Sequence, residues 1–162
     1  MLRHGAYKPA GRSKPASEYL LSAAQASDFP LVNGPVDVNN AVSLSWGYPG
    51  SIFDAARSGW ELALRRGRPG ESYVFNASGQ SIDLEDLLCV CRSSEGSWVP
   101  CGNPVKDSME TKTSPSTTDV IAVLFAPVVD AEADLRAAAQ RFSSLLGLHC
   151  GATETGFQVV SG

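Results

Sequence analysis

The spacing of apolar residues changes twice along the chain, and this change restricts the fold more than any other feature. Near both ends, apolar residues recur every three or four positions, which is typical of amphipathic helices. In the middle they alternate with polar residues or form short continuous runs, which is typical of strands. Helices on either side of a group of strands predict an α+β fold in layers rather than an alternating βαβ fold.

Three segments have helical spacing, and they are residues 14–27, 36–46 and 130–150. Asp37 is suited to cap the second helix, and Asp130 is suited to cap the third. Gly147 or Gly151 can end the third helix, because glycine readily adopts the left-handed conformation found there. Between the second helix and the strands, residues 47–54 (GYPGSIFD) are expected to form a turn.

Four segments are predicted to contribute strands, and they are residues 60–65, 71–84, 87–91 and 119–127. The first alternates, with Leu62 and Leu64 on one face and Ala63 and Arg65 on the other. The second is predicted to be a hairpin that turns between Asn76 and Gly79. The last is apolar nearly throughout, which favours a central strand.

The length and charge of the chain limit its organisation and its partners. We expect the 162 residues to form a single domain over residues 1–150, followed by a C-terminal tail, 151–162, that lacks a strong pattern and is expected to be flexible. The net charge of −4 argues against a protein that coats nucleic acid nonspecifically. The sequence has no candidate membrane span and no signal-peptide core, so a cytoplasmic protein without a membrane partner is expected.

The cysteines and histidines do not follow a metal-binding pattern. The chain has 4 Cys and 2 His, and Cys89 and Cys91 stand on one face of a strand without a second ligand pair. No metal and no cofactor are therefore expected. We predict reduced and mostly buried thiols instead.

The segment from Val36 to Asp54 carries a more specific signal. It resembles the B3/B4 tRNA-binding and editing domain of the β subunit of bacterial phenylalanyl-tRNA synthetase, in the freestanding form. The matching positions are Val36, Asp37, Asn40, Val42, Leu44, Gly47, Pro49, Phe53 and Asp54. The resemblance extends from about Phe29 to Pro127 and includes the pair Gly70-Glu71 and the apolar strand after Thr118.

The resemblance implies a three-layer fold, with a β-sandwich-like core and helices packed outside. It also implies a pocket that accepts the aminoacylated 3′ end of tRNA and hydrolyses the ester of a wrong amino acid in trans. Aminoacylation itself is not expected. Two alternatives remain: a noncatalytic RNA- or tRNA-binding module, and a protein that binds a free amino acid or a related metabolite.

The family keeps an active-site loop before its last buried strand, and Lys106–Thr113 stands at that place. Hydrolysis needs a positioned water, a group that steers or deprotonates it, and donors for the oxyanion. Asp107 or Glu110 could orient the water or bind the α-ammonium group. Lys106 or Lys112 could bind a phosphate or the oxyanion, and Ser108 or Thr113 could donate a hydrogen bond.

The remaining candidates follow from the same resemblance and are expected to contact the substrate. Asp37, Asn40 and Ser43 belong to the second predicted helix, and Ser51 occupies the position of a histidine in the synthetase. Glu71 and Asn76 lie in the predicted hairpin. Structural roles compete with this interpretation: Asp37 as a helix cap, Glu71 as an exposed strand residue and Asn76 as a turn former.

Overall fold

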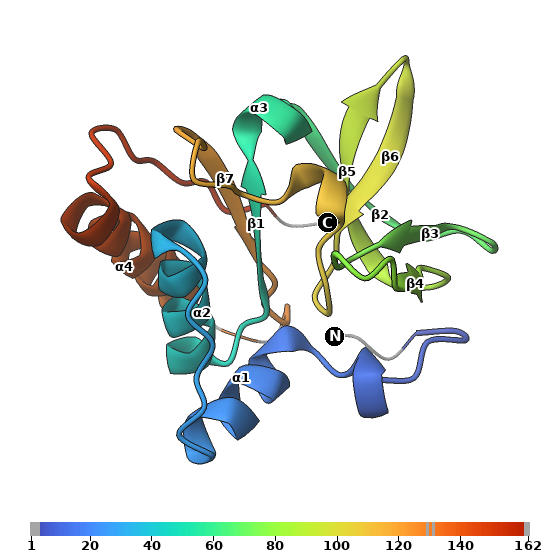
Figure 1. Ribbon diagram of the computed structural model, residues 1–162, viewed down its shortest axis with the longest axis horizontal. Helices are drawn as coiled ribbons and strands as arrows, with labels where there is room; N and C mark the ends of the chain where they lie inside the picture. Colours follow the sequence, from blue (N-terminus) through green and yellow to red (C-terminus); the bar gives the residue numbers. More distant parts are fainter. Residues whose placement is uncertain (1–3, 129, 131, 161–162) are drawn as a thin grey trace.

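The computed structural model describes residues 4–128, 130 and 132–160 of the chain (Figure 1). Its α-helices are α1 (Ala16–Gln25), α2 (Gly34–Trp46), α3 (Ala55–Ser58) and α4 (Glu132–Cys150). Two 3-10 helices are η1 (Gly11–Ser13) and η2 (Met109–Thr111). The strands are β1 (Gly50–Asp54), β2 (Leu62–Arg66), β3 (Ser72–Val74), β4 (Ser81–Asp83), β5 (Leu88–Ser94), β6 (Ser97–Gly102) and β7 (Val120–Leu124).

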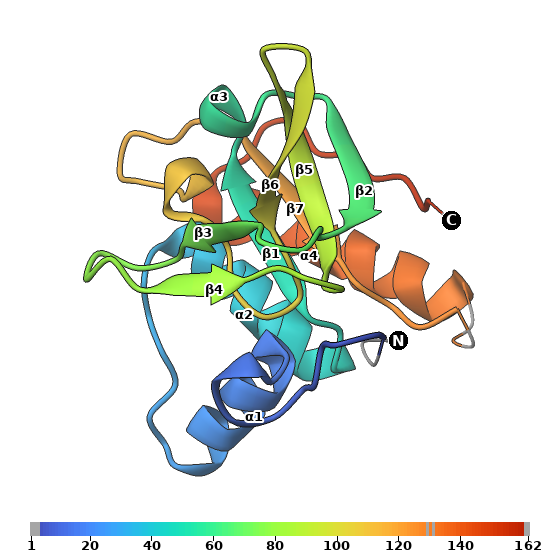
Figure 2. The same cartoon turned by 90° about the vertical axis from the view of Figure 1, so that its right-hand side faces the viewer.

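The strands form three small antiparallel sheets, β1-β7, β2-β5-β6 and β3-β4. Helices α2 and α4 lie against one face of β1-β7, and the three-stranded sheet lies on the other side of it (Figure 1). Figure 2 shows the β3-β4 hairpin running across the direction of the three-stranded sheet. This arrangement confirms the predicted α+β fold, with layered sheets at the centre and helices outside.

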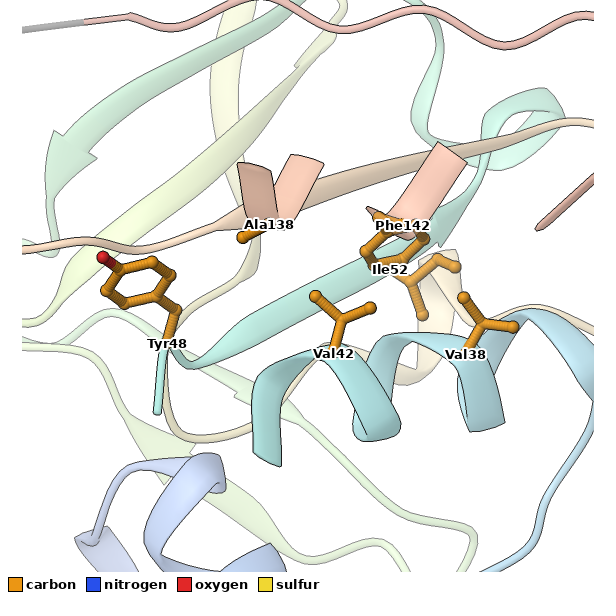
Figure 3. Packing of buried hydrophobic residues seen from close by; sticks show 6 residues of the cluster. All are labelled: Val38, Val42, Tyr48, Ile52, Ala138 and Phe142. Carbon is orange, nitrogen blue, oxygen red and sulfur yellow. The ribbon is translucent and has the colours of Figure 1, made fainter. Parts of the chain in front are cut away.

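The layer of helices is joined to β1 by a compact apolar cluster. Val38 and Val42 of α2 point toward Ala138 and Phe142 of α4, and Ile52 of β1 closes the cluster (Figure 3). The two residues on each helix are four positions apart, so they share one face. Burial of each large side chain contributes on the order of 1.5–3 kcal/mol. The same spacing predicted α4 from the sequence, and the structure confirms it.

A second apolar cluster holds the two main sheets together. Phe53 of β1 is fully buried against Val90 of β5, Cys101 of β6 and Phe125, which follows β7. Ile52 and Phe53 are consecutive in β1, so their side chains point to opposite faces of the strand. β1 therefore contributes to both clusters and lies between the helices and the three-stranded sheet.

Helix α2 begins earlier than the sequence predicted, and its cap is a different residue. Asn33, not Asp37, caps the helix, because its Oδ1 accepts a 3.1 Å hydrogen bond from the Val36 amide. Pro35 in the first turn has no amide hydrogen to satisfy and so fits this start. Asp37 lies inside the first turn, where its Oδ1 accepts a 2.7 Å hydrogen bond from the Val32 amide.

The segment GYPGSIFD is only partly a turn. Gly47 ends α2 with a φ of 73°, a conformation that favours glycine, but residues from Gly50 onward form β1. β7 pairs only with β1 among the described strands, so the expectation that it is a central strand is wrong. Its apolar composition has another cause, because Ala122 and Leu124 pack toward the helices and Val123 packs toward the three-stranded sheet.

The exposed and buried faces of β2 differ from the predicted alternation. Leu64 is 50% exposed, whereas the side chain of Arg65 is 20% exposed. Arg65 is covered because its guanidinium lies against Glu71 and the Trp98 carbonyl. Apolar character alone therefore did not indicate the face of β2 that is covered.

β6 is a strand that the sequence pattern did not predict. It forms a hairpin with β5, and the turn places Glu95 at φ 49° and Gly96 at φ 76°. Pro100 argues against a central strand, but β6 lies at the edge of its sheet, where proline is tolerated. The register also shifts between Val90 and Cys91, which accommodates an irregular partner.

The other predicted elements are confirmed. α1 lies within residues 14–27, and the 71–84 hairpin is present as β3 and β4, with a turn closed by a 3.1 Å hydrogen bond from the Gly79 amide to the Asn76 carbonyl. Gly151, at φ 69°, follows the last residue of α4, while Gly147 lies inside that helix. Residues 151–160 contain no helix or strand and are largely exposed. None of the described helices combines the length and the hydrophobicity needed to cross a membrane.

The cysteines are mostly buried, as predicted. Cys89, Cys91 and Cys101 are buried and Cys150 is half-buried, and none forms a disulfide. Burial raises the pKa of the Cys89 and Cys101 thiols to about 12. Among the described residues, no group of three or more His, Cys, Asp and Glu side chains is arranged to hold a metal ion.

Candidate functional site

The loop that follows β6 is anchored to the strand from which it leaves. The Ser108 amide donates a 2.9 Å hydrogen bond to the Cys101 carbonyl, and the Thr111 hydroxyl donates to the same oxygen at 3.3 Å. The Ser108 Oγ accepts a hydrogen bond from the Glu110 amide and so caps η2. The predicted active-site loop is therefore an ordered segment, and Ser108 is buried within it.

Asp107 reaches from this loop to β1. Its Oδ2 accepts a 3.2 Å hydrogen bond from the Ile52 amide, and its Oδ1 is buried without a hydrogen-bond partner among the described residues. Burial raises the pKa of this carboxyl to about 7, against the lowering effects of the Ser51 hydroxyl, the Ile52 amide, the Lys112 charge and the Asn103 backbone. A carboxyl that titrates near neutrality can act as a base at physiological pH.

Ser51 lies beside this carboxyl, on β1. It is fully buried, and its Oγ donates a 3.3 Å hydrogen bond to the Asn103 carbonyl. The same hydroxyl lies close enough to Asp107 to lower the pKa of that carboxyl, although its single hydrogen is donated to the Asn103 carbonyl. The structure thus brings together two predicted site residues, Ser51 and Asp107, that are 56 positions apart in the sequence. In this structure Ser51 supports the carboxyl and has no exposed surface to offer a ligand.

Asn103 and Tyr73 complete the cluster, and sequence reasoning missed both. Asn103 is 2% exposed, and its Oδ1 accepts hydrogen bonds from the Val105 and Lys106 amides at 2.8 and 2.9 Å. Its Nδ2 donates to the Tyr73 hydroxyl at 2.6 Å, and that hydroxyl donates to the Lys106 carbonyl at 2.6 Å. The dipeptide Asn103-Pro104 is a turn signal that could have identified Asn103, whereas no local pattern points to Tyr73.

The two predicted lysines of the loop both contact Phe75. The Lys106 ammonium lies 4.5 Å from the centre of the Phe75 ring, and the Lys112 ammonium donates a 2.6 Å hydrogen bond to the Phe75 carbonyl. Lys106 and Phe75 also line a shallow hollow of about 470 Å³ beside the β3-β4 hairpin. The positive charge of the loop is therefore concentrated at the hairpin, and the charge of Lys112 still acts on Asp107.

Two outer residues connect the loop to other elements. Glu110 forms a 2.8 Å ion pair with Arg92 of β5, although its side chain is 68% exposed. Thr113 accepts a 3.1 Å hydrogen bond from Nδ2 of Asn33, the cap of α2. The contact between Asn33 and Thr113 places the start of α2 next to the end of the predicted loop.

The remaining residues predicted on α2 do not join the Asp107 cluster. Ser43 is fully buried, and its Oγ has no partner among the described residues. Asn39, one turn earlier, donates a 3.2 Å hydrogen bond to the Gly50 carbonyl, while its Oδ1 is also unpartnered. Asn40 is half-buried on this helix, and the negative charge of Asp37 raises the pKa of Cys150 in addition to the effect of burial.

Glu71 and Asn76 also lie outside the cluster. Glu71 forms two hydrogen bonds with the Arg65 guanidinium, at 2.7 and 2.8 Å, and accepts another from the Arg68 amide. Asn76 organises the hairpin turn, because its Oδ1 accepts hydrogen bonds from the Gln80 amide and the Ser78 hydroxyl. The contacts of Asn76 are those of the turn former considered for it. Glu71, in contrast, immediately precedes β3 and is half-buried and paired with Arg65, so it is not the exposed strand residue that was considered.

Comparison with known proteins identifies the family of this layered domain. A model of the B3/4 domain matches residues 8–144, which include β1, the loop with Asp107 and most of α4. The chain belongs to the B3/4 domain family. This match confirms the resemblance carried by residues 36–54.

The B3/4 domain is also similar to parts of longer curated proteins. It is 27% identical over 85 residues to the phenylalanine–tRNA ligase beta subunit of Rhodopseudomonas palustris, which covers 52% of this chain and 10% of that subunit. It is 26% identical over 110 residues to the corresponding subunit of Nitrobacter winogradskyi, which covers 68% of this chain and 13% of that subunit. The chain thus matches roughly a tenth of the length of these relatives.

Proposed function

We propose that this B3/4 domain binds aminoacyl-tRNA and hydrolyses the ester of a wrongly attached amino acid in trans, with Asp107 as the group that activates water. The family and the similarity to phenylalanine–tRNA ligase beta subunits support a role connected with tRNA. The placement of Asp107 carries the catalytic part. Asp107 lies in the loop that follows β6. Its Oδ2 accepts a hydrogen bond from the Ile52 amide, and its Oδ1 has no hydrogen-bond partner among the described residues.

The surroundings of Asp107 suit the chemistry of ester hydrolysis. A carboxylate that accepts a proton from water in the transition state contributes roughly 10²- to 10⁴-fold to a rate, and it works best when its pKa lies near the working pH. Burial brings the pKa of Asp107 to about 7. The charge of Lys112 acts on the same carboxyl, and in this proposal the lysine also stabilises the negative charge that develops on the carbonyl oxygen of the ester.

Hydrolysis by this route requires the loop to open when substrate binds, because Oδ1 is covered. Three contacts hold the outer part of the loop: the Glu110–Arg92 ion pair, the Lys112–Phe75 hydrogen bond and the Thr113–Asn33 hydrogen bond. Ion pairs with an exposed partner contribute only about 0–1 kcal/mol. A phosphate of the tRNA competes directly for Arg92 and Lys112 and so favours the open loop.

Binding of tRNA without hydrolysis is the second candidate, and the covered Oδ1 is the observation that favours it. A carboxyl that stays enclosed serves only to join the loop to β1. In that case Lys106 and Lys112 would contact phosphates, and affinity for tRNA would fall as the salt concentration rises.

Release of amino acid from a panel of mischarged tRNAs tests the proposal. We expect the protein to release one or more of these amino acids and Asp107→Asn to lower kcat by about 10²- to 10⁴-fold. Asp28→Asn is the matched control, because Asp28 is an exposed aspartate in the segment before α2. Binding without release would support the second candidate. Absence of both binding and release would overturn the proposal.

A further inference from the structure

The hydroxyl of Tyr73 connects the β3-β4 hairpin to the backbone of the candidate loop. It accepts a 2.6 Å hydrogen bond from Asn103 and donates a 2.6 Å hydrogen bond to the Lys106 carbonyl. A tyrosine hydroxyl has one hydrogen to donate, so this hydroxyl uses its donor on the residue immediately before Asp107. Tyr73 therefore fixes both ends of the turn from which the Asp107 side chain projects.

Asn103 connects the turn held by Tyr73 to β1, which lies on the other side of the Asp107 carboxyl. Its Oδ1 binds two consecutive loop amides, and its own carbonyl accepts a hydrogen bond from Ser51. Ser51 and the Ile52 amide are the groups of β1 that contact or stabilise Asp107. The carboxyl is thus held between β1 and a turn whose shape depends on Asn103 and Tyr73.

Electrostatics provide an independent connection between these residues. The charge of Asp107 raises the pKa of Tyr73, in addition to the larger effect of burial, and it also raises the pKa of Cys101. On the opposite side, the charge of Lys112 lowers the pKa of Asp107. The titratable and charged groups that face Asp107 are therefore Tyr73, Cys101 and Lys112.

We propose that Tyr73 is a positioning residue, whose hydroxyl acts through Asn103 and the Lys106 carbonyl to hold Asp107 against β1 in its reactive orientation. This inference rests on the proposed function for its catalytic consequence, but the placement of the carboxyl is measurable without any substrate. A residue that acts only on stability lowers the unfolding midpoint and leaves the ionisation of Asp107 unchanged. A positioning residue changes that ionisation.

The test compares Tyr73→Phe with Tyr48→Phe in the full chain. Both tyrosines are largely covered and have a raised pKa, but Tyr48 belongs to the cluster between α2 and α4. The carboxyl carbon of Asp107 is followed by ¹³C NMR from pH 3 to pH 9, and Asp107→Asn identifies its signal. The deacylation rate is measured over the same range.

In Tyr73→Phe we expect the midpoint of the Asp107 titration to fall toward the ordinary aspartate value, because the freed turn lets water reach the carboxyl. We also expect the pH–rate profile to shift in the same direction and kcat to decrease about tenfold. Tyr48→Phe should change neither the midpoint of the Asp107 titration nor that of the pH–rate profile. An unchanged Asp107 midpoint in folded Tyr73→Phe would overturn the inference.

A second variant keeps the test decisive if Tyr73→Phe does not fold. In Asn103→Ser, the serine oxygen can still accept hydrogen bonds from the loop amides, but it is too short to reach the Tyr73 hydroxyl. The same fall of the Asp107 midpoint is expected, and its absence counts against the inference. If the unaltered protein hydrolyses no ester, the proposed function fails, while the NMR titrations still decide whether Tyr73 positions Asp107.

Discussion

The amide of Ile52 donates a 3.2 Å hydrogen bond to Oδ2 of Asp107, and this contact joins β1 to the loop that follows β6. The two residues are 55 positions apart. One carboxylate oxygen is therefore fixed by the backbone of the most buried strand, while the other is enclosed beside Gly102, where an added Cβ would lie 2.7 Å from it. The orientation of the carboxyl depends on the strand, the loop and the absence of a side chain at residue 102.

We expect the stability of the protein to decrease with pH because of Asp107. Its pKa is about 7 in the folded state and near 3.8 when unfolded, so between these values the folded state binds more protons. Stability from this group is complete below pH 3.8 and is lost as the pH rises through 7. The free energy of unfolding of Asp107→Asn should therefore exceed that of the unaltered protein at pH 8, by about 4 kcal/mol, but not at pH 4. Urea unfolding at both values measures the difference, with Asp28→Asn as the control, and a difference independent of pH would contradict it.

The cap of α2 should contribute to stability through two separable hydrogen bonds. Asn33→Ala removes both the acceptor for the Val36 amide and the donor to Thr113, and we expect a loss of about 1–2 kcal/mol. Asn33→Asp keeps the acceptor and removes only the donor, so its loss should be smaller. Hydrogen exchange at Thr113 should increase in both variants. Equal stabilities of the two variants would show that the cap contributes little.

The half-buried ion pair between Arg65 and Glu71 should stabilise the attachment of β2 to the β3-β4 hairpin. Glu71→Gln replaces a paired carboxylate with a neutral amide, and we expect a loss of about 2 kcal/mol at pH 7. The hydrogen bonds from Arg65 lower the pKa of Glu71, so the effect is complete above its unfolded value and disappears as the pH falls below it. Glu61→Gln, at an exposed site before β2, is the control. An effect of Glu71→Gln that persists at pH 2 would contradict this account.

Gly67 is required by the close approach of two backbones. A Cβ on this residue would lie 1.8 Å from the Leu84 carbonyl oxygen, and the backbone at Leu84 is buried and hydrogen-bonded. We expect Gly67→Ala to destabilise the fold by more than about 2 kcal/mol, because a rigid neighbour must move. Gly156→Ala provides the matched control, since nothing lies within 4 Å of its added Cβ. Thermal unfolding of both variants measures the difference. An unfolding midpoint of Gly67→Ala as little changed as that of Gly156→Ala would contradict the prediction.

Elements that depend on local spacing could be predicted from the sequence. The stripe on α4 and the turn from Asn76 to Gly79 involve residues within a few positions of one another, and both are present. β6 could not be predicted, because Pro100 is compatible with a strand only at a sheet edge, and the sequence does not indicate which strand lies at the edge. The cap of α2 was assigned to Asp37, although local signals for an earlier start were present: Asn33 caps the helix three residues before Val36, and Pro35 fits the first turn.

In the candidate site, too, some residues could be predicted from the sequence and others depend on contacts between distant segments. Asp107 could be proposed because the family resemblance indicates a loop before the last strand, and its contact with β1 is consistent with that proposal. Asn103 and Tyr73 could not be proposed, since their roles arise from a hydrogen-bond network across three segments of the chain. Glu71 was included because Gly70-Glu71 matches a family pair, and Asn76 because it lies near the hairpin turn. In the structure Glu71 pairs with Arg65 of β2, and Asn76 organises the turn.

The labelling rates of the three buried thiols can report how often the protein opens locally. A thiol reacts with alkylating reagents as its thiolate, and burial that raises the pKa of Cys101 to about 12 suppresses this form at neutral pH. Labelling of Cys101 must therefore wait until the surrounding strand and loop separate, while half-buried Cys150 supplies a faster reference in the same chain. Because the Cys101 carbonyl anchors Ser108 and Thr111, its labelling rate reports how often the candidate loop leaves its anchor.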